Sequence, residues 1–354
     1  MEPRDYSERL AAAGRAAGLA DVGVAHVGAW TWSRGTLEDR REAGVAGSMS
    51  FTYRNPPRST EPGRILPGAR SLVVGAWRYS VGEPAPRSPS ATAARVARYA
   101  AQDTYAALRA GLDAVAATLK ADGHRAVVIA DDNALVDREA AFRAGLGFYG
   151  KNSNLLLRGG GGSWVVLGAV VTTASLATLH PPAAEECGTC RRCLDGCPTG
   201  AIVAPGVVDA RRCLSWVLQA PGSIPVELRA AIGDRIYGCD DCQEVCPPSR
   251  RAAGEVHPAP DATGRWIDAA AWLAMDDADL IAAAGRWYVA GHDPSILRRN
   301  LLVVLGNAGA SGDPAVAAAI ESHLDHPDPV VAEHARWARQ NVTAPAALQH
   351  DGAP

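Results

Sequence analysis

The sequence predicts an α/β domain over residues 1–180, a cysteine-rich domain over 181–255 and a small α-helical region over 256–342. Three observations predict this order. Buried-strand patterns alternate with a helical pattern in the first half, all eight cysteines fall between Cys187 and Cys246, and apolar residues recur at helical spacing near the C-terminus. The last residues, 343–354, are predicted to be a disordered tail.

Strand and helix patterns alternate in the N-terminal region. The predicted strands are "SLVVGAW" (71–77), "RAVVIA" (125–130) and "SWVVLGAVVTT" (163–173). Between the first two, residues 91–123 show apolar residues at helical spacing and end on a glycine. A strand, a long helix and a strand predict a crossover unit. The glycine-rich loops match neither a P-loop nor a dinucleotide-binding pattern, so no nucleotide is predicted.

Three amphipathic helices are predicted near the C-terminus, at 295–309, 313–324 and 328–340. The last two begin Asp-Pro, which places an N-cap residue before a proline at the first helical position. Short helices punctuated in this way are typical of HEAT-type repeats. The segment is long enough for only a small helical layer of this kind.

Composition restricts the function classes. Apolar residues make up 47% and charged residues 21%, which is ordinary globular usage, and the net charge of −3 excludes a polyanion binder that is basic throughout. The first residues carry neither a long apolar segment nor a twin arginine, and "SWVVLGAVV" is too short to span a bilayer. We therefore expect a cytoplasmic protein without a membrane partner, whose cysteines bind metal instead of forming disulfides.

The eight cysteines form two runs and a single residue. The first run is C-x2-C-x2-C-x3-C-P, the second is C-x2-C-x3-C-P, and Cys213 lies between them. Ferredoxin-like domains hold two [4Fe–4S] clusters with such runs, and the last cysteine of each run serves the other cluster. This rule assigns Cys187, Cys190, Cys193 and Cys246 to one cluster, and Cys197, Cys213, Cys239 and Cys242 to the other.

Two structural zinc sites are the alternative, since four-cysteine zinc sites also use C-x2-C pairs. Zinc needs neither the triple spacing nor the two cysteine–proline endings. The gap between Cys213 and Cys239 is longer than in an ordinary ferredoxin, and an inserted helix within residues 214–232 is predicted to fill it. Two clusters imply one-electron transfers, and the large flanking regions imply a second cofactor or a large substrate.

The motifs resemble those of the epoxyqueuosine reductase family, cobalamin- and iron–sulfur-dependent enzymes that complete queuosine in tRNA. The resemblance lies in "RILPGARSLVV", in "DDNALVDREAAFRAGLGFYGKNSNLLL", in both cysteine runs with "VDARRC" and "GSIP", and in "RRNLLVVLGNA". It implies that cobalamin binds the N-terminal domain and that an epoxide on the wobble base of tRNA is reduced with two electrons and two protons. An unidentified donor supplies the electrons.

The resemblance implies that Asp131 donates a proton to the opening epoxide oxygen. Asp131 must then stay protonated near neutral pH, and the adjacent Asp132 is a possible source of the necessary repulsion. The alternative is that Asp131 caps the following helix. Two residues depart from the family pattern: Ala134 replaces a usual proline, which is expected to loosen the turn, and Tyr105 lies at or beside a usual histidine.

Several residues are candidate contacts for cobalamin and for tRNA. For cobalamin they are Arg58, Ser215 and the Lys151–Asn154 turn with Asn152, Ser153 and Asn154, each of which is alternatively an ordinary surface or turn residue. For tRNA phosphates they are the doublets Arg191/Arg192 and Arg298/Arg299, with Arg211/Arg212 and Arg250/Arg251 as further basic pairs. Arg286, Trp287 and Tyr288 predict either a base-stacking patch or a buried anchor.

Two other functions fit part of the pattern. Another cobalamin and iron–sulfur reductase, similar to reductive dehalogenases, uses the same electron chemistry, but those enzymes usually carry a twin-arginine signal. A non-enzymatic iron–sulfur electron-transfer scaffold is the second alternative, and it leaves Asp131 and the "GKN" segment without a role.

Overall fold

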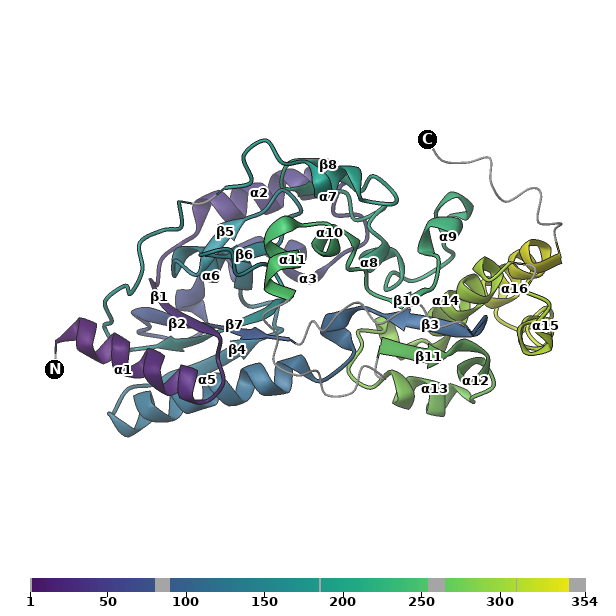
Figure 1. Ribbon diagram of the computed structural model, residues 1–354. Coiled ribbons are helices and arrows are strands. Elements are labelled where there is room, and N and C mark those ends of the chain that lie inside the picture. The colour runs from purple at the N-terminus through teal and green to yellow at the C-terminus, as the bar shows by residue number, and fades with distance from the viewer. Residues whose placement is uncertain (1, 80–89, 185, 254–264, 310, 344–354) are drawn as a thin grey trace. The chain divides into compact units, whose positions relative to one another are not determined.

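The computed structural model describes residues 2–79, 90–184, 186–253, 265–309 and 311–343 (Figure 1). The chain forms two compact units. The first unit is Met1–Glu83, Asp103–Arg211 and Asp241–Ala259; the second is Pro84–Gln102, Arg212–Asp240 and Pro260–Pro354. This division differs from the three consecutive domains predicted, because the cysteine region contributes to both units. Residues 344–354, the predicted disordered tail, lie outside the described part of the chain.

A four-stranded sheet organises the first unit. Its order is β1 (Asp21–His26), β2 (Ser71–Arg78), β7 (Val165–Thr172) and β4 (Ala126–Ala130), and every neighbouring pair is antiparallel. The three predicted strands are confirmed to within two residues at each end. Strands β2 and β4 run parallel to each other because both are antiparallel to β7. The predicted crossover is therefore present, but β7 lies between its two strands.

Helices cover both faces of this sheet (Figure 1). Helices α1 (Pro3–Ala16) and α5 (Thr104–Ala121) contact one another and pack against one face. Helix α6 (Asp137–Arg143) packs against β1, β2 and β7. The apolar core between α6 and the sheet contains Leu72, Val74 and Ala76, which alternate along β2. They pack in one cluster with alanines of α6.

The remaining elements of the first unit are short and carry the site. They are α2 (Thr31–Glu42), α3 (Phe51–Arg54), α4 (Pro56–Ser59), η1 (Pro62–Arg64), the hairpin of β5 (Gly147–Tyr149) and β6 (Leu155–Leu157), α7 (Arg192–Asp195), the hairpin of β8 (Ile202–Ala204) and β9 (Val207–Val208), α10 (Asp241–Glu244) and α11 (Pro247–Ala253).

The segment predicted as one long helix, residues 91–123, is helical only in its second part. Strand β3 (Ala93–Val96) and η2 (Arg98–Ala100) precede α5, whose N-cap Asp103 accepts a hydrogen bond from the Ala106 N–H at 2.7 Å. β3 is the central strand of a three-stranded sheet in the second unit, parallel to β10 (Arg235–Tyr237) and antiparallel to β11 (Trp266–Asp268). Pairing on both edges therefore overrides the helical spacing of its side chains.

The second unit is mainly helical. Its helices are α8 (Leu214–Val217), α9 (Val226–Ile232), α12 (Ala269–Leu273), α13 (Asp277–Ala284), η4 (Ala290–His292), α14 (Pro294–Asn307), α15 (Pro314–Glu321) and α16 (Pro329–Thr343). The three predicted C-terminal helices are confirmed as α14, α15 and α16. The helix predicted within 214–232 is instead two short helices, because the Pro- and Gly-containing segment "APGSIP" separates them. No helix of the described residues is long and apolar enough to cross a membrane.

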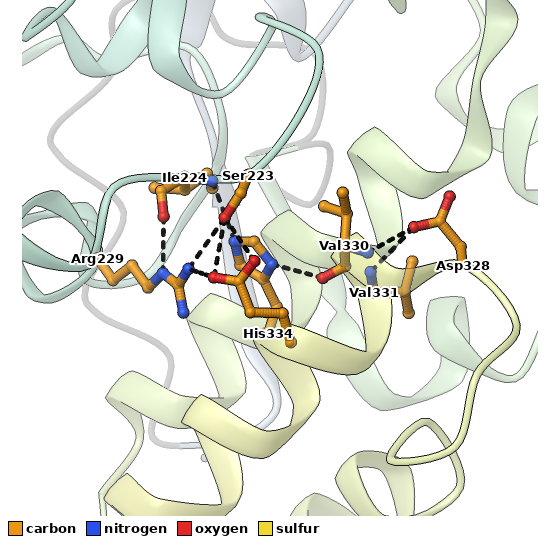
Figure 2. A network of polar contacts seen from close by, with 8 residues as sticks. Ser223, Ile224, Arg229, Asp328, Val330, Val331 and His334 are labelled. Carbon is orange, nitrogen blue, oxygen red and sulfur yellow. Dashed lines mark hydrogen bonds and ion pairs between the residues drawn. The ribbon is translucent and has the colours of Figure 1, made fainter.

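A polar network ties α16 to the loop before α9 (Figure 2). The buried imidazole of His334 donates from Nδ1 to the Val330 carbonyl at 2.7 Å and accepts at Nε2 from the Ile224 N–H at 3.2 Å. The buried Arg229 pairs with Glu333 and donates to the Ile224 carbonyl at 2.8 Å. Burial lowers the pKa of His334 to about 4, so the imidazole is neutral at neutral pH.

Candidate active site and iron–sulfur ligands

Asp131 lies in a tight turn directly after β4. Its backbone is left-handed, with φ at 55°, which is uncommon outside glycine. The following residues hold the turn: the Asp132 Oδ1 accepts the Ala134 N–H at 2.7 Å, and the Ser59 hydroxyl of α4 donates to the Asn133 carbonyl at 2.8 Å. Asp131 is exposed, and α6 begins six residues later at Asp137 with Val136 at its N-cap. The alternative reading of Asp131 as a helix cap is therefore wrong.

Ala134, where the family usually has a proline, takes part in the hydrogen bonding of this turn. Ala134 is 8% exposed, and its N–H is the donor in the hydrogen bond to Asp132. Proline has no N–H and could not make this bond. The hydrogen bond to Asp132 is therefore specific to a residue with an N–H at this position, and the loosening expected relative to a proline stays a prediction.

Asp137 is a site residue that the sequence analysis missed. Burial raises the pKa of its carboxyl well above the usual range, the nearby Asp131 and Asp132 raise it further, and Arg138 and Arg109 oppose the rise. Its Oδ1 is buried and has no hydrogen-bond partner in the described part of the chain. Acidic residues are common in the first turn of a helix, which hides this carboxyl in the sequence.

Arg58 extends the same polar site. It lies in α4, its side chain is 59% exposed, and one guanidinium nitrogen is 4.0 Å from the Asp132 Oδ1. The segment before β2 and the turn after β4 therefore bring an exposed cation beside the exposed carboxyl of Asp132.

Four cysteines surround a cavity of about 180 Å³ in the first unit. They are the four assigned to one cluster: Cys187, Cys190, Cys193 and Cys246. Burial raises the pKa of the Cys193 thiol to about 11, and the other three thiols add to the rise because they are close enough to repel its thiolate. Within the described ranges no three His, Cys, Asp or Glu side chains converge on a point that would hold a single ion. The thiols instead surround a volume.

The other four cysteines are divided between the units. In the first unit, the Cys197 sulfur accepts the Ala201 N–H at 3.2 Å, and the Cys242 sulfur lies 3.9 Å from the Asn154 side-chain nitrogen. In the second unit, Cys213 is the N-cap residue of α8 and Cys239 packs against the apolar cluster around Leu214 and Val217. Ser215 is partly buried in α8, and its carbonyl accepts a bond from Gln219.

The "KNSN" turn joins β5 to β6 and contacts the cysteine region. Lys151 donates to backbone carbonyls beside Cys187 and at Cys190, the buried Asn152 donates to the Cys242 carbonyl at 3.3 Å, and the Ser153 hydroxyl donates to the Gly206 carbonyl at 2.7 Å. The observed contacts therefore serve the iron–sulfur region. The predicted cobalamin contacts of Asn152, Ser153 and Asn154 stay a prediction.

The two arginine doublets predicted to contact tRNA have opposite environments. Arg191 and Arg192 are exposed, and Arg191 makes a 3.7 Å ion pair with the exposed Asp195. Arg298 and Arg299 are 6% and 1% exposed. Arg298 bonds to Asp277 and two backbone carbonyls, and Arg299 to the carbonyls of Val217 and Ala220. The prediction of tRNA contacts for Arg298 and Arg299 is wrong, because a buried guanidinium cannot reach a phosphate.

The other candidate tRNA residues also differ in how exposed their side chains are. Arg211, Arg212, Arg250 and Arg251 are exposed. Trp287 is partly buried, stacks on Tyr237 with ring centroids 4.7 Å apart and donates to the Ala100 carbonyl, so of the two alternatives it serves as an anchor of the helical region. Tyr288 is 41% exposed.

Comparisons with known proteins agree with the cysteine geometry. Residues 186–249 match the family model of a 4Fe-4S double cluster binding domain. The chain is 34% identical to the epoxyqueuosine reductase of Xanthomonas campestris pv. campestris, over 95% of this chain and 96% of that protein. It belongs to the epoxyqueuosine reductase family. The epoxyqueuosine reductase of Pseudomonas aeruginosa is 32% identical over 95% of this chain and 94% of that protein.

Solved structures of epoxyqueuosine reductases share the fold. One contains a tRNA-Tyr epoxyqueuosine-modified stem loop; it matches with a TM-score of 0.85 and 29% identity over 97% of this chain and 91% of that chain. Another, from Bacillus subtilis, has its catalytic aspartate loop swung out of the active site and matches with a TM-score of 0.84 and 29% identity over the same shares. The resemblance found in the sequence motifs is confirmed.

Proposed function

We propose that this epoxyqueuosine reductase-family protein reduces epoxyqueuosine to queuosine at the wobble position of tRNA. One observation carries the proposal: similarity to a named epoxyqueuosine reductase extends over 95% of the chain, so it includes both the Asp131 turn and the cysteine region. In the reaction both C–O bonds of the epoxide break. Two electrons and two protons convert the oxygen to water, and a double bond forms between the two ring carbons that held it.

We assign the eight cysteines to two [4Fe–4S] clusters as the spacing predicts. The cavity lined by Cys187, Cys190, Cys193 and Cys246 supports the first assignment, because four thiols around a volume suit a cluster. Cys197 and Cys242 of the first unit and Cys213 and Cys239 of the second are the proposed ligands of the other. Each cluster transfers one electron at a time, so an external donor must deliver two electrons per turnover.

Cobalamin is the proposed second cofactor. The exposed guanidinium of Arg58 can donate hydrogen bonds to its phosphate and amide oxygens. Asn152, Ser153, Asn154 and Ser215 remain candidate contacts. When bound, cobalamin supplies a low-valent metal centre able to reduce the epoxide carbon. The chain's own contribution is to position the substrate and to supply the protons.

Asp131 is the proposed proton donor to the epoxide oxygen. Burial, Asp131 and Asp132 raise the pKa of the neighbouring Asp137 carboxyl, so this region holds a second carboxyl whose protonated form is favoured. The left-handed backbone of Asp131 is held by the hydrogen bonds of Asp132 and Ser59, a restrained conformation of the kind found at active sites. The loop of the B. subtilis enzyme that bears the catalytic aspartate supports the assignment.

The proposed substrate is an anticodon stem loop, because unpaired loop bases can enter a pocket that duplex bases cannot reach. A related enzyme has been solved with such a stem loop. Arg191 and Arg192 are exposed and remain candidates for phosphate contacts. We expect the protein to act as a monomer.

The test is anaerobic incubation with epoxyqueuosine-containing tRNA, cobalamin and a strong reductant, followed by mass analysis of the nucleosides. We expect the wild type to remove one oxygen and Asp131→Asn to lose at least a hundredfold in rate. The matched control is Asp113→Asn, the same substitution at an exposed position of α5, which is expected to retain full activity. Full activity of Asp131→Asn would reject the proton-donor role, and an inactive wild type would reject the function.

A further inference from the structure

Backbone hydrogen bonds and strand pairing hold the turn between β5 and β6. The Gly150 N–H donates to the Asn154 carbonyl at 2.8 Å, and the Ser153 N–H donates to the Gly150 carbonyl at 2.9 Å. Ser153 adopts a left-handed backbone, with φ at 63°. β5 and β6 pair directly on either side of this turn. These contacts therefore define the backbone of the turn from Lys151 to Asn154.

Lys151 reaches the loop that bears the first cysteines. Its ammonium donates to the Gly188 carbonyl at 2.6 Å and to the Cys190 carbonyl at 2.9 Å. The same side chain lines the cavity enclosed by Cys187, Cys190, Cys193 and Cys246. Lys151 thus holds the backbone between two ligand cysteines and places a positive charge at the wall of the cavity.

Two other charged residues line this cavity, Glu186 and Arg192, and both are exposed. Their charges are opposite, and solvent and salt screen exposed charges strongly. Lys151 is half-buried and directed by two short hydrogen bonds. Of the charged side chains that line the cavity, it is the one whose charge is least screened.

A charge at this position affects electron uptake. Reduction adds one negative charge to a cluster already held by four thiolates, and the potential of such clusters depends on local net charge, hydrogen bonds and solvent exposure. A nearby cation stabilises the reduced form and so raises the reduction potential.

We propose that Lys151 is a positioning residue that raises the reduction potential of the cluster bound by Cys187, Cys190, Cys193 and Cys246. The inference rests on the ligand assignment proposed above. It gives the lysine of the "GKN" segment a role in electron delivery, separate from substrate or cobalamin binding.

The test compares Lys151→Met, which removes the charge, with Lys151→Arg, which keeps it. The full chain is purified anaerobically with reconstituted clusters, its iron and sulfide are quantified, and each cluster is titrated potentiometrically with EPR detection in the absence of tRNA and cobalamin. In Lys151→Met we expect the reduction equilibrium of one cluster to weaken about tenfold, which is about 59 mV for a one-electron couple. Lys151→Arg should remain within about twofold of the wild type, as should the exposed-site control Arg192→Met.

Unchanged potentials in a fully loaded Lys151→Met protein would overturn the proposal. Lys151→Gln, which keeps a hydrogen-bond donor without the charge, decides the matter if Lys151→Met loses iron. Two further outcomes would also overturn the proposal. One is a wild-type potential in Lys151→Gln; the other is loss of the cluster from both neutral variants while Lys151→Arg retains it. Either would show that Lys151 holds the structure together without changing the reduction potential. Wild-type protein without two clusters would instead refute the ligand assignment.

Discussion

Asp137 in the first unit and His334 in the second are both titratable side chains whose neutral form is favoured by burial. Their hydrogen bonding differs. Both ring nitrogens of His334 have partners, the Val330 carbonyl and the Ile224 N–H, whereas the buried Oδ1 of Asp137 has none in the described ranges. An unpaired buried polar atom costs free energy. His334 therefore stabilises its unit, whereas Asp137 lowers the stability of the first unit and lies beside the proposed catalytic residue.

The largest expected effect is that of His334→Ala. The substitution leaves the buried Ile224 N–H and Val330 carbonyl without partners and removes a fully buried ring, so we expect the free energy of unfolding to fall by about 4 kcal/mol. Chemical denaturation of the purified protein measures it. The control is His26→Ala at an exposed strand end, expected to change stability by less than about 0.5 kcal/mol. Similar effects at both positions would contradict the structural role of His334.

The second effect is the pH dependence contributed by His334. Its pKa falls from 6.5 to about 4 on folding, so the unfolded state binds a proton more readily than the folded state. The contribution of His334 to the free energy of unfolding is fully present above pH 6.5. It falls by about 3 kcal/mol as the pH decreases toward about 4. Denaturation midpoints across this range measure the loss. His334→Gln should flatten the slope, and an unchanged slope would assign it to other groups.

The smallest expected effect is that of Asp137→Asn, which should stabilise the protein where the changes at His334 destabilise it. Asp137 has a folded pKa above its unfolded value, so it destabilises the protein once the pH exceeds the unfolded value of 3.8. We expect Asp137→Asn to raise the free energy of unfolding by about 1 kcal/mol at neutral pH and to lose this gain in acid. Chemical denaturation at neutral and at acidic pH measures both changes. A variant that is less stable than the wild type at neutral pH would remove the contrast with His334.

The sequence predicted the elements whose signal is local. The buried strands at 71–77 and 125–130 and the helices that begin Asp-Pro were found close to their positions in the structure, because apolar runs and N-caps report on a few neighbouring residues. The motifs also identified the family, and their spacing grouped the four cysteines that line one cavity.

The errors concern contacts between distant segments. β3 lies in a segment with helical spacing, and its strand partners are more than a hundred residues away. Arg298 and Arg299 look like a surface doublet, but α14 is buried from Ile296 to Gly306, and its arginines find carbonyl partners in other segments. The burial of the Asp137 oxygen likewise depends on the packing of other segments, which no short pattern encodes.

The alternation of the chain between the two units constrains how the protein can be made. The first unit needs residues up to Ala259 and the second begins at Pro84, so no single cut releases either unit as a continuous fragment. During synthesis the first unit can be completed only after its last stretch has left the ribosome, by which time the cysteine region has been translated in full. Cys246 lies in that last stretch, so the proposed cluster of Cys187, Cys190, Cys193 and Cys246 cannot have all four ligands before this stage of synthesis.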